Sequence, residues 1–600
     1  MMNKTLITNG YVFDQEKQVW SKPDYKEISY NDGDKTELNI KNIILNANDL
    51  SVLSTELSQH CNDWASTYHL SSSRANILRP FFHELQTTDI LEIGSGCGAI
   101  TRYLGECGGN VIALEGSLRR ADITRARTRD IKNVTVIAEK FDDFQYPHKF
   151  DVITLIGVLE YANLYVQGEN PAITMLTKVC SMLKPNGKLF IAIENQLGLK
   201  YFAGSPEDHL GKAMYGIEGR YQKDQPQTFG RATLSEMLKK SGFSKSEFFV
   251  PFPDYKLPVS ILTEQGFNQD KFDAKAFAWQ SARRDPQLPP ICNFSLELAW
   301  SVIFNNKVAL DLANSFLIVA SPQIQPLLSN NVLAYHYSTD RRPEFCKETI
   351  FKLAANKIII QYNALANENE KNTFLIKYNL PNSTDYIFGE PLAWKFVQIV
   401  TKDGWSIDEV TQFTRNYLDI IKKILSQQGF HDDLFSPSCQ IPGCFFDALA
   451  HNIIVDENGN AFLIDQEWEL TNTIDVGYLL FRQLSICVGY ITRFGSNDSE
   501  KKITYSQFFE GVFNGVGLKI DSHTFSYYVK TELKIAAQIR GKSMSRNPYS
   551  EFKVQFLPAE SVSQLYTMLI NSRSWKITQP LRSINQILKR IISHKVSSPV

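Results

Sequence analysis

The stretch DILEIGSGCGAITRYL, residues 89–104, carries the clearest local signal of the fold. It opens with a β-branched apolar run, Asp89–Ile93, that predicts a buried strand, and it ends in residues that predict a helix. Gly94, Gly96 and Gly98 lie between the two, where glycine permits a tight turn and a close backbone approach to a ligand. The stretch therefore predicts a strand–turn–helix unit in a ligand-binding α/β domain.

Further strand-like runs follow, with room for a helix or a loop between them. They are Asn110–Leu114, Val134–Ala138, Asp151–Ile156 and Lys188–Ile193. This alternation predicts a doubly wound, mostly parallel sheet. Two later runs, Glu247–Pro251 and Asn314–Ala320, predict extra strands at one edge, and the Pro-rich, charged segment 254–290 between them predicts an insertion or lid.

Acidic residues and one more glycine lie near the ends of these strands: Glu92, Glu115, Glu139, Gly157 and Glu160. Glu115 ends the second strand, where a carboxylate can accept hydrogen bonds from both hydroxyls of a ribose. The glycines alone would equally fit a tight turn in an unrelated α/β protein. Together with the acidic residues they predict a nucleoside pocket.

These turns resemble motif I and the following motifs of class I S-adenosylmethionine (SAM)-dependent methyltransferases. The resemblance implies a Rossmann-like fold with SAM as cofactor. It also implies that Glu139 lies near the adenine of SAM and that Glu160 lies near the methyl donor or the acceptor. The predicted SAM-binding residues are Glu92, Gly94, Gly96, Gly98, Glu115, Glu139, Gly157 and Glu160.

A loop rich in acids, Lys, His and Gly follows the fifth strand, at the edge where open parallel sheets bind ligands. Three stretches resemble methyltransferases of bacterial surface-polysaccharide biosynthesis: 68–80, 192–209 and 216–221. His209 is the predicted catalytic residue and would take a proton from a sugar hydroxyl. If the acceptor is an anionic phosphate, His209, Lys200 or Arg220 would position it instead. Taken in isolation, His209 would be a structural histidine.

A linker rich in Pro, Ser and Asn, residues 321–331, precedes a second unit. In it, Asp447 and Asn452 have the five-residue offset of the kinase catalytic loop, and Asp465 ends an apolar strand as the metal-binding Asp of kinases does. Such an Asp accepts the proton of an acceptor hydroxyl, while the Asn and the second Asp hold Mg²⁺ against ATP. A chance hairpin with acidic ends is the alternative.

The segment HNIIVDENGNAFLIDQEW, residues 451–468, resembles the aminoglycoside and choline kinases. The resemblance implies an α+β kinase-like fold with ATP and Mg²⁺ as cofactors. It implies that Asp447 is the catalytic base and that Asn452 and Asp465 bind the metal.

The second unit also departs from the kinase pattern. It has no G-x-G-x-x-G loop, and the turn 338–343 offers arginines that would contact phosphates instead. Gln361 lies near the position of the ATP-binding lysine, which Lys347, Lys352 or Lys357 would replace. The alternative is a pseudokinase that serves as a scaffold or regulator.

The C-terminal segment predicts a basic amphipathic helix, because Leu581, Ile584, Leu588 and Ile591 share one helical face. Such a helix would lie on an anionic membrane surface, dock on a partner or pack on its own protein. The segment 574–582 resembles the ends of surface-glycan glycosyltransferases.

Composition limits the function classes. The 63 Lys and Arg residues balance 64 Asp and Glu, for a net charge of −1, which argues against a nucleic-acid-coating surface. Nine scattered Cys residues fit a reducing cytoplasm. The sequence has neither a signal-peptide core nor an apolar run of about 18 residues. We therefore expect a cytoplasmic protein, or one bound peripherally at the inner face of the cell membrane.

The sequence predicts four parts: an N-terminal extension (1–50), a methyltransferase domain (51–322), a kinase-like domain (332–500) and a helical C-terminal region (501–600). This order resembles the bifunctional enzymes that terminate O-antigen polymannose chains by phosphorylating and then methylating the terminal sugar. The chain differs from them because it lacks a long heptad region. The resemblance implies a lipid-linked polysaccharide acceptor and a glycosyltransferase or polymerase partner. The alternatives are a methyltransferase that acts on a glycan hydroxyl beside a pseudokinase, and a membrane adaptor without catalysis.

Overall fold

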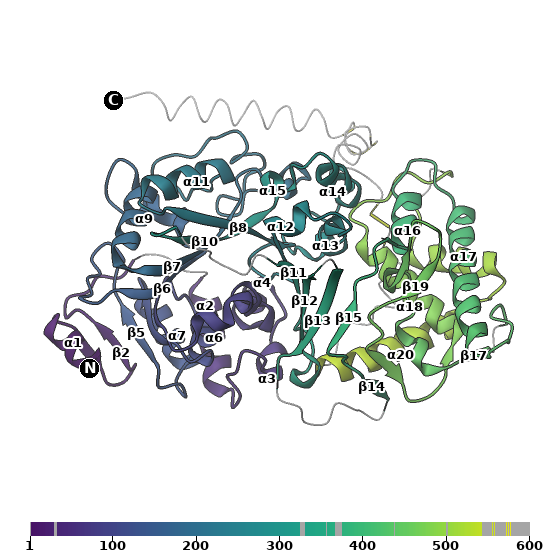
Figure 1. Cartoon of the computed structure of the whole chain (residues 1–600), viewed down its shortest axis with the longest axis horizontal. Coiled ribbons are helices and arrows are strands. Elements are labelled where there is room, and N and C mark those ends of the chain that lie inside the picture. Colours follow the sequence, from purple (N-terminus) through teal and green to yellow (C-terminus); the bar gives the residue numbers. More distant parts are fainter. Residues whose placement is uncertain are drawn as a thin grey trace.

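One continuous sheet of fourteen strands runs through the described part of this computed structural model (Figure 1). The structure describes residues 2–28, 33–324, 331–355, 357–366, 375–436, 439–499 and 502–542, together with residues 555, 557, 558, 572, 574 and 577. The strands lie side by side in the order β1 (Val12–Asp14), β2 (Val19–Ser21), β5 (Val134–Ala138), β4 (Asn110–Glu115), β3 (Asp89–Ile93), β6 (Phe150–Ile156), β7 (Leu183–Glu194), β10 (Ser315–Ser321), β8 (Lys245–Phe252), β9 (Ser260–Thr263), β11 (Val332–Ser338), β12 (Lys347–Ala354), β13 (Lys357–Ala364) and β15 (Ser383–Asp385).

The strands β5, β4, β3, β6 and β7 form the parallel part of the sheet. Parallel neighbours need long connections, and most of those here contain a helix. The connecting helices are α6 (Ala99–Glu106), α7 (Leu118–Arg127), α8 (Ala162–Tyr165) and α9 (Pro171–Met182). Apolar side chains cover both faces of these strands in two separate buried clusters. The predicted Rossmann-like, doubly wound arrangement is therefore confirmed.

The first fifty residues add to this sheet. The hairpin β1–β2 extends it, because β2 pairs in parallel with β5. The helices that precede β3 are α1 (Met2–Thr8), α2 (Asp34–Asn46), α3 (Thr55–Ser58), α4 (Trp64–Leu70), the 3₁₀ helices η1 (Ser72–Ile77) and η2 (Arg79–Phe81), and α5 (Phe82–Leu85). In α2, the buried Glu37 pairs with Arg119 and Arg120 of α7, so α2 is anchored to the parallel part of the sheet.

The two predicted extra strands exist as β8 and β10, and they extend the parallel part of the sheet beyond β7, but the sheet does not end with them. β10 lies between β7 and β8, and β9 continues the sheet beyond them. The segment 254–290 is not a lid, because it contributes β9, α12 (Glu264–Asn268) and α13 (Ala274–Ser281), and every residue of β9 is buried. Helices α10 (Leu199–Phe202), α11 (Arg231–Lys240), α14 (Leu296–Asn305) and α15 (Ala309–Leu312) complete this half of the chain.

The sheet does not stop at the predicted boundary near residue 322. β11 pairs antiparallel with β9, with Ala334 opposite Leu262 and His336 opposite Ser260. Strands β12, β13 and β15 then follow in antiparallel order. In Figure 1 they stand between the methyltransferase-like sheet and a helical region. The two sequence units therefore share one sheet.

The helical region follows β15. It consists of α16 (Ala393–Val400), α17 (Ile407–Gln427), α18 (Val476–Tyr490), α19 (Tyr505–Val516) and α20 (Ser522–Arg540). Small strand pairs lie among these helices: β14 (Ile376–Tyr378) with β20 (Trp468–Leu470), β16 (Glu390–Pro391) with β18 (Ile453–Val455) and β19 (Ala461–Leu463), and β17 (Gln440–Ile441) with β21 (Ile474–Asp475).

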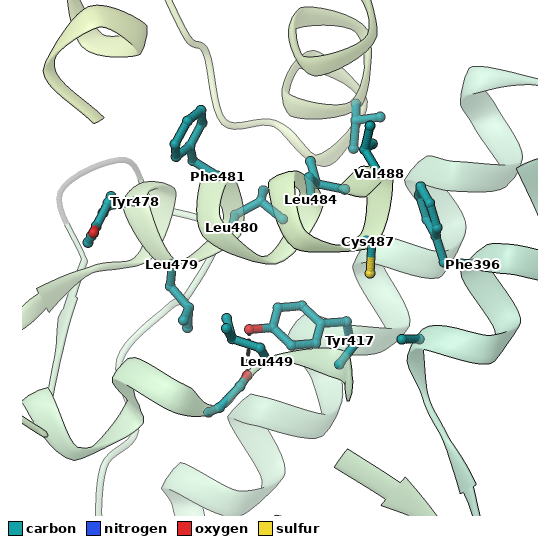
Figure 2. Close-up of a cluster of buried hydrophobic side chains, with 14 of the residues drawn as sticks. Phe396, Tyr417, Leu449, Tyr478, Leu479, Leu480, Phe481, Leu484, Cys487 and Val488 are labelled. Atoms are coloured by element: carbon teal, nitrogen blue, oxygen red, sulfur yellow. Dashed lines mark hydrogen bonds between the residues drawn. The ribbon is translucent and has the colours of Figure 1, made fainter. Parts of the chain in front are cut away.

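Helix α17 organises the core of this region. It begins with a capping box, in which Ser406 and Glu409 satisfy each other's backbone N–H groups. Its buried face includes Tyr417, whose hydroxyl donates to the Ala448 carbonyl oxygen at 2.8 Å. Figure 2 shows this bond beneath α18, which packs Leu479 and other apolar side chains into the same cluster. The bond ties α17 to the loop that holds Asp447.

The predicted amphipathic tail, Leu581–Ile591, lies outside the described residues. Within the described ranges, no helix combines the length and the apolar character that crossing a bilayer requires.

Trp279 of α13 joins the two halves of the chain. Its side chain is fully buried in the hydrophobic cluster of the helical region, with ring centroids 5.4 Å from Trp394 and 5.3 Å from Tyr490. Truncation of a buried Trp removes its transfer free energy and leaves a cavity.

We predict that Trp279→Ala lowers the free energy of unfolding by about 3–5 kcal/mol. Denaturant unfolding followed by fluorescence and by circular dichroism measures the change. The matched control is Tyr527→Ala, because Tyr527 is an aromatic residue with 58% exposure and should change stability by less than about 1 kcal/mol. Equal effects of the two substitutions would contradict the joining role of Trp279.

Candidate functional site

A pocket of about 440 Å³ lies at the carboxyl ends of the parallel strands. Open parallel sheets bind their ligands at this edge. Of the residues predicted from the sequence, Glu92, Gly94, Gly96, Glu115, Glu139, Gly157, Glu160 and His209 line the pocket. Gly98 does not line it. Gly98 starts α6 with φ +82°, and an added Cβ would lie 2.9 Å from the Thr124 Cα of α7, so its role is close packing.

Gly96 is the open point of the loop between β3 and α6. It has φ +57°, and no atom lies within 4 Å of the place where a Cβ would be. A side chain here would therefore be strained and would project into free space beside the pocket. This fits a loop over which a ligand lies in direct contact with the backbone.

Glu115 is held by this loop. Its carboxylate accepts hydrogen bonds from the backbone N–H of Gly96 at 2.7 Å and of Ser117 at 3.0 Å. Burial raises the pKa of Glu115, and the charge of Arg120 and these N–H groups oppose that rise. The carboxylate is thus fixed at the end of β4, where the ribose of a nucleoside would lie.

Glu139 lies beside Glu115 at the end of β5. It accepts a hydrogen bond from the hydroxyl of Tyr11, a residue of the N-terminal segment. No local sequence pattern predicts this contact, because Tyr11 and Glu139 are 128 residues apart.

Glu92, in β3, also lines the pocket, and burial raises the pKa of its carboxyl group to about 7.

The opposite end of the pocket holds Glu160, Glu194 and His209. His209 Nε2 lies 3.6 Å from Glu194 Oε2, and His209 Nδ1 lies 3.1 Å from the hydroxyl of Tyr161. Burial lowers the pKa of His209, but the interaction with Glu194 and the charges of Glu160 and Glu207 together outweigh burial and raise that pKa to about 9. Burial, reinforced by Glu194, raises the pKa of Glu160 to about 8.

A buried ion network supports this end of the pocket. Lys200 is fully buried, and its Nζ lies 3.1 Å from both Asp208 and Asp254. Lys256 lines the pocket and pairs with Glu194 and with Asp208, the latter at 2.9 Å. Lys200 therefore neutralises the buried acids Asp208 and Asp254 and does not line the pocket.

Of the three residues predicted to position an anionic acceptor, only His209 lines the pocket. Lys200 lies beneath it, and Arg220 pairs with Glu218 away from it. Sequence reasoning missed Tyr255 and Lys256 because they lie in the segment 254–290, interpreted as a lid.

The second site lies at one end of the β18–β19 hairpin. Asn452 immediately precedes β18 and Asp465 follows β19, and the Ile464 N–H donates to the Asn452 carbonyl oxygen at 2.9 Å. Asn452 Nδ2 donates to the Asp447 carbonyl oxygen at 3.0 Å, so the hairpin and the loop before it hold the three predicted residues together. Burial raises the pKa of Asp447 to about 8.

Lys347 is the lysine that reaches this site. Its Nζ lies 2.7 Å from Asp465 Oδ1 and 2.5 Å from Glu467 Oε2. The other two candidates point elsewhere: Lys352 donates to Gln361, and Lys357 is exposed beside Asp385. The side-chain oxygens of Asn452 and Asp465 fit the preference of Mg²⁺ for oxygen ligands.

The turn 338–343 does not present free arginines. Arg341 pairs with Glu467 at 2.7 Å, and Arg342 pairs with Glu344 at 2.6 Å. The backbone oxygen of Thr339 accepts from the Ser72 hydroxyl at 2.6 Å, and the Thr339 hydroxyl accepts from Asn76 at 3.0 Å. The turn is therefore bound to η1, the element that also carries Arg74 to the first pocket.

Comparisons with known proteins agree with the first site. Residues 91–189 match the family model of a methyltransferase domain. One similar solved structure is that of the N-methyltransferase NodS from Bradyrhizobium japonicum WM9 in complex with S-adenosyl-L-homocysteine. NodS is 16% identical to this chain, and the match covers 37% of this chain and 94% of NodS with a TM-score of 0.25. A SAM-dependent methyltransferase from Mesorhizobium loti is 18% identical over 41% of this chain and 97% of its own, with a TM-score of 0.25.

A phosphoethanolamine N-methyltransferase from Haemonchus contortus is 18% identical over 41% of this chain and 52% of its own, with a TM-score of 0.26. No curated protein matches the sequence. The family match identifies a methyltransferase domain within this part of the chain, and the parallel sheet and the pocket give it a Rossmann-like fold with a ligand site at the carboxyl ends of the strands.

We predict that Gly96→Val weakens the binding of S-adenosylhomocysteine by roughly 100-fold, because the side chain would occupy ligand space. Isothermal titration calorimetry measures the affinity. The matched control is Gly108→Val: Gly108 has φ +89°, also with no atom near an added Cβ, but it does not line the pocket. Both substitutions should destabilise the fold by about 1–2 kcal/mol, and only Gly96→Val should reduce binding. Unchanged binding in Gly96→Val would contradict this assignment of the pocket.

Proposed function

We propose that the chain is a bifunctional enzyme that caps the non-reducing end of a bacterial surface polysaccharide such as O-antigen. ATP-dependent phosphorylation of the terminal sugar comes first, and SAM-dependent methylation of the new phosphate or of a hydroxyl follows. The observation that carries the methylation half is the single pocket that joins the Gly96–Glu115 end to Glu160 and His209. The phosphorylation half rests on the kinase-like arrangement around Asp447.

Each end of the first pocket has its own task. SAM supplies an electrophilic methyl group. Glu115 receives the ribose hydroxyls, while the open backbone at Gly96 lets the nucleoside approach closely. At the other end, the neutral form of His209 would take the proton of a hydroxyl acceptor, and the raised pKa of about 9 confines this role to alkaline pH. At neutral pH the protonated ring would hold an anionic phosphate acceptor together with Lys256. Arg74 binds the backbone oxygens of Tyr255 and Lys256 at 3.2 Å and keeps that wall in place.

The geometry of the second site supports phosphotransfer. In its ionised form, which the raised pKa of about 8 favours only at alkaline pH, Asp447 would accept the proton of the sugar hydroxyl. Asn452 and Asp465 would hold Mg²⁺, and Lys347 would bind ATP phosphates. The Tyr417–Ala448 hydrogen bond fixes the residue next to Asp447. Lys347 is nearly fully buried and lies at Asp465, which supports Lys347 rather than Lys352 or Lys357 as the proposed ATP-binding lysine.

A pseudokinase is the second candidate function for this unit, and two observations favour it. Lys347 is engaged by both Asp465 and Glu467, and the turn 338–343 is bound to η1. In this case the methyltransferase acts on a glycan hydroxyl, and the second unit serves as a scaffold.

The proposed acceptor is a lipid-linked polysaccharide, and the proposed partner is a glycosyltransferase or polymerase. We place the enzyme in the cytoplasm or at the inner face of the cell membrane. The support for the acceptor, partner and membrane contact is the sequence resemblance, including that of the tail beyond the described residues.

The decisive experiment mixes the full chain with short polysaccharide primers, labelled ATP and labelled SAM. We predict that Asp447→Asn lowers phosphate transfer by at least about 100-fold, because the base is lost. It should leave methylation of an already phosphorylated primer intact. The matched control is Asp456→Asn, a partly exposed acid whose side chain, within the described part of the chain, bonds to the turn of the same hairpin.

Methyl transfer that proceeds equally without ATP would contradict the proposed order. Combined with ATP binding but no phosphate transfer, it would establish the pseudokinase alternative.

A further inference from the structure

Three side chains from separate elements converge at the acceptor end of the pocket. Glu160 lies in η3 (Leu159–Tyr161) after β6, Glu194 is the last residue of β7, and His209 lies in the loop after α10. Each offers one donor atom, and the three atoms lie within 4.8 Å of one another. All three residues line the pocket, so a ligand in it can reach them.

Both carboxylates of this cluster have one buried oxygen without a hydrogen bond. Glu160 is 1% exposed and Glu194 is fully buried. Among the described residues, neither Glu160 Oε2 nor Glu194 Oε2 has a hydrogen-bond partner, although His209 Nε2 lies 3.6 Å from the latter. A buried polar atom that is left unpaired costs about 1–3 kcal/mol, more if it is charged. A cation between these oxygens would offset that cost.

Neighbouring groups aim the donors toward a common point. The other oxygen of Glu194, Oε1, contacts Lys256 Nζ and accepts from the Tyr255 hydroxyl at 3.3 Å, which leaves Oε2 facing His209. The Nδ1 atom of His209 is bonded to the Tyr161 hydroxyl, so Nε2 is the nitrogen directed at the carboxylates. Metal-binding histidines and carboxylates are oriented by outer hydrogen bonds of this kind.

The geometry points to a site for one divalent transition-metal ion bound by Glu160, Glu194 and His209. Donor atoms on one such ion lie about 3–4 Å apart, so small side-chain shifts would close the observed cluster around it. The imidazole favours Mn²⁺, Fe²⁺, Co²⁺ or Zn²⁺ over Mg²⁺ and Ca²⁺, which prefer oxygen ligands.

Three protein ligands leave coordination positions open on such an ion. An oxygen of the acceptor, as hydroxyl or as phosphate, would take one of them and would be held at the end of the pocket opposite Glu115. This role rests on the proposed methyl transfer, whereas binding of the ion itself does not.

The test is titration of the full chain with Mn²⁺, with free Mn²⁺ followed by electron paramagnetic resonance. All variants carry Asp465→Asn, so that the second site does not contribute. We expect one ion per chain, bound at least roughly 10-fold more weakly in Glu160→Gln and in His209→Gln. Glu139→Gln is the matched control, because Glu139 lines the same pocket at the nucleoside end. It should bind Mn²⁺ normally and S-adenosylhomocysteine more weakly.

Retained binding of S-adenosylhomocysteine shows that the Glu160 and His209 variants are folded. Absence of Mn²⁺ and Zn²⁺ binding, or binding unaffected by both substitutions, would overturn the metal site. Methyl transfer that survives a chelator would then leave the proposed function standing. Conversely, metal binding that depends on Glu160 and His209, with no methyl transfer to any primer, would contradict the proposed methyl transfer and support the metal site.

Discussion

The first site depends on one constraint: the parallel strands β3, β4, β6 and β7 all end at the same edge of the sheet. The functional residues lie at or directly after the ends of these strands, so their side chains are close to the pocket without long extension. Gly96 follows β3, Glu115 ends β4, Glu160 follows β6 and Glu194 ends β7. The apolar clusters on both faces of the sheet fix this edge, so the pocket keeps its shape through packing far from the ligand.

The same edge separates two electrostatic environments. At the nucleoside end, backbone N–H groups hold the Glu115 carboxylate. At the acceptor end, Lys256 and His209 face Glu194 and are themselves backed by the buried Lys200 network. The two ends of one cavity therefore differ in what holds their acidic groups: backbone N–H groups at Glu115, and buried cationic side chains at Glu194.

Sequence reasoning found the parts of the fold that depend on local pattern. The glycine turn and the carboxylate at Glu115 follow from residues within about one strand–helix–strand unit, and the apolar strand before Asp465 follows from an equally local pattern. Contacts between distant segments could not be found that way. Tyr11 at Glu139 and Lys256 at Glu194 join residues that no periodicity relates, and the choice of Lys347 among three lysines required the register of β12. The strand β9 was missed because a short strand lay inside a Pro-rich, charged segment.

The pairing of β9 with β11 has a practical consequence for anyone who wishes to study either half by itself. A cut at the Pro- and Ser-rich connection near residue 322 would strip a neighbour from both strands and leave each with a row of unsatisfied peptide groups. Unpaired edge strands of this kind pair with strands of other chains, so the separated halves would self-associate or precipitate. The roles of the two halves are therefore better separated by point substitutions in the full chain than by truncation.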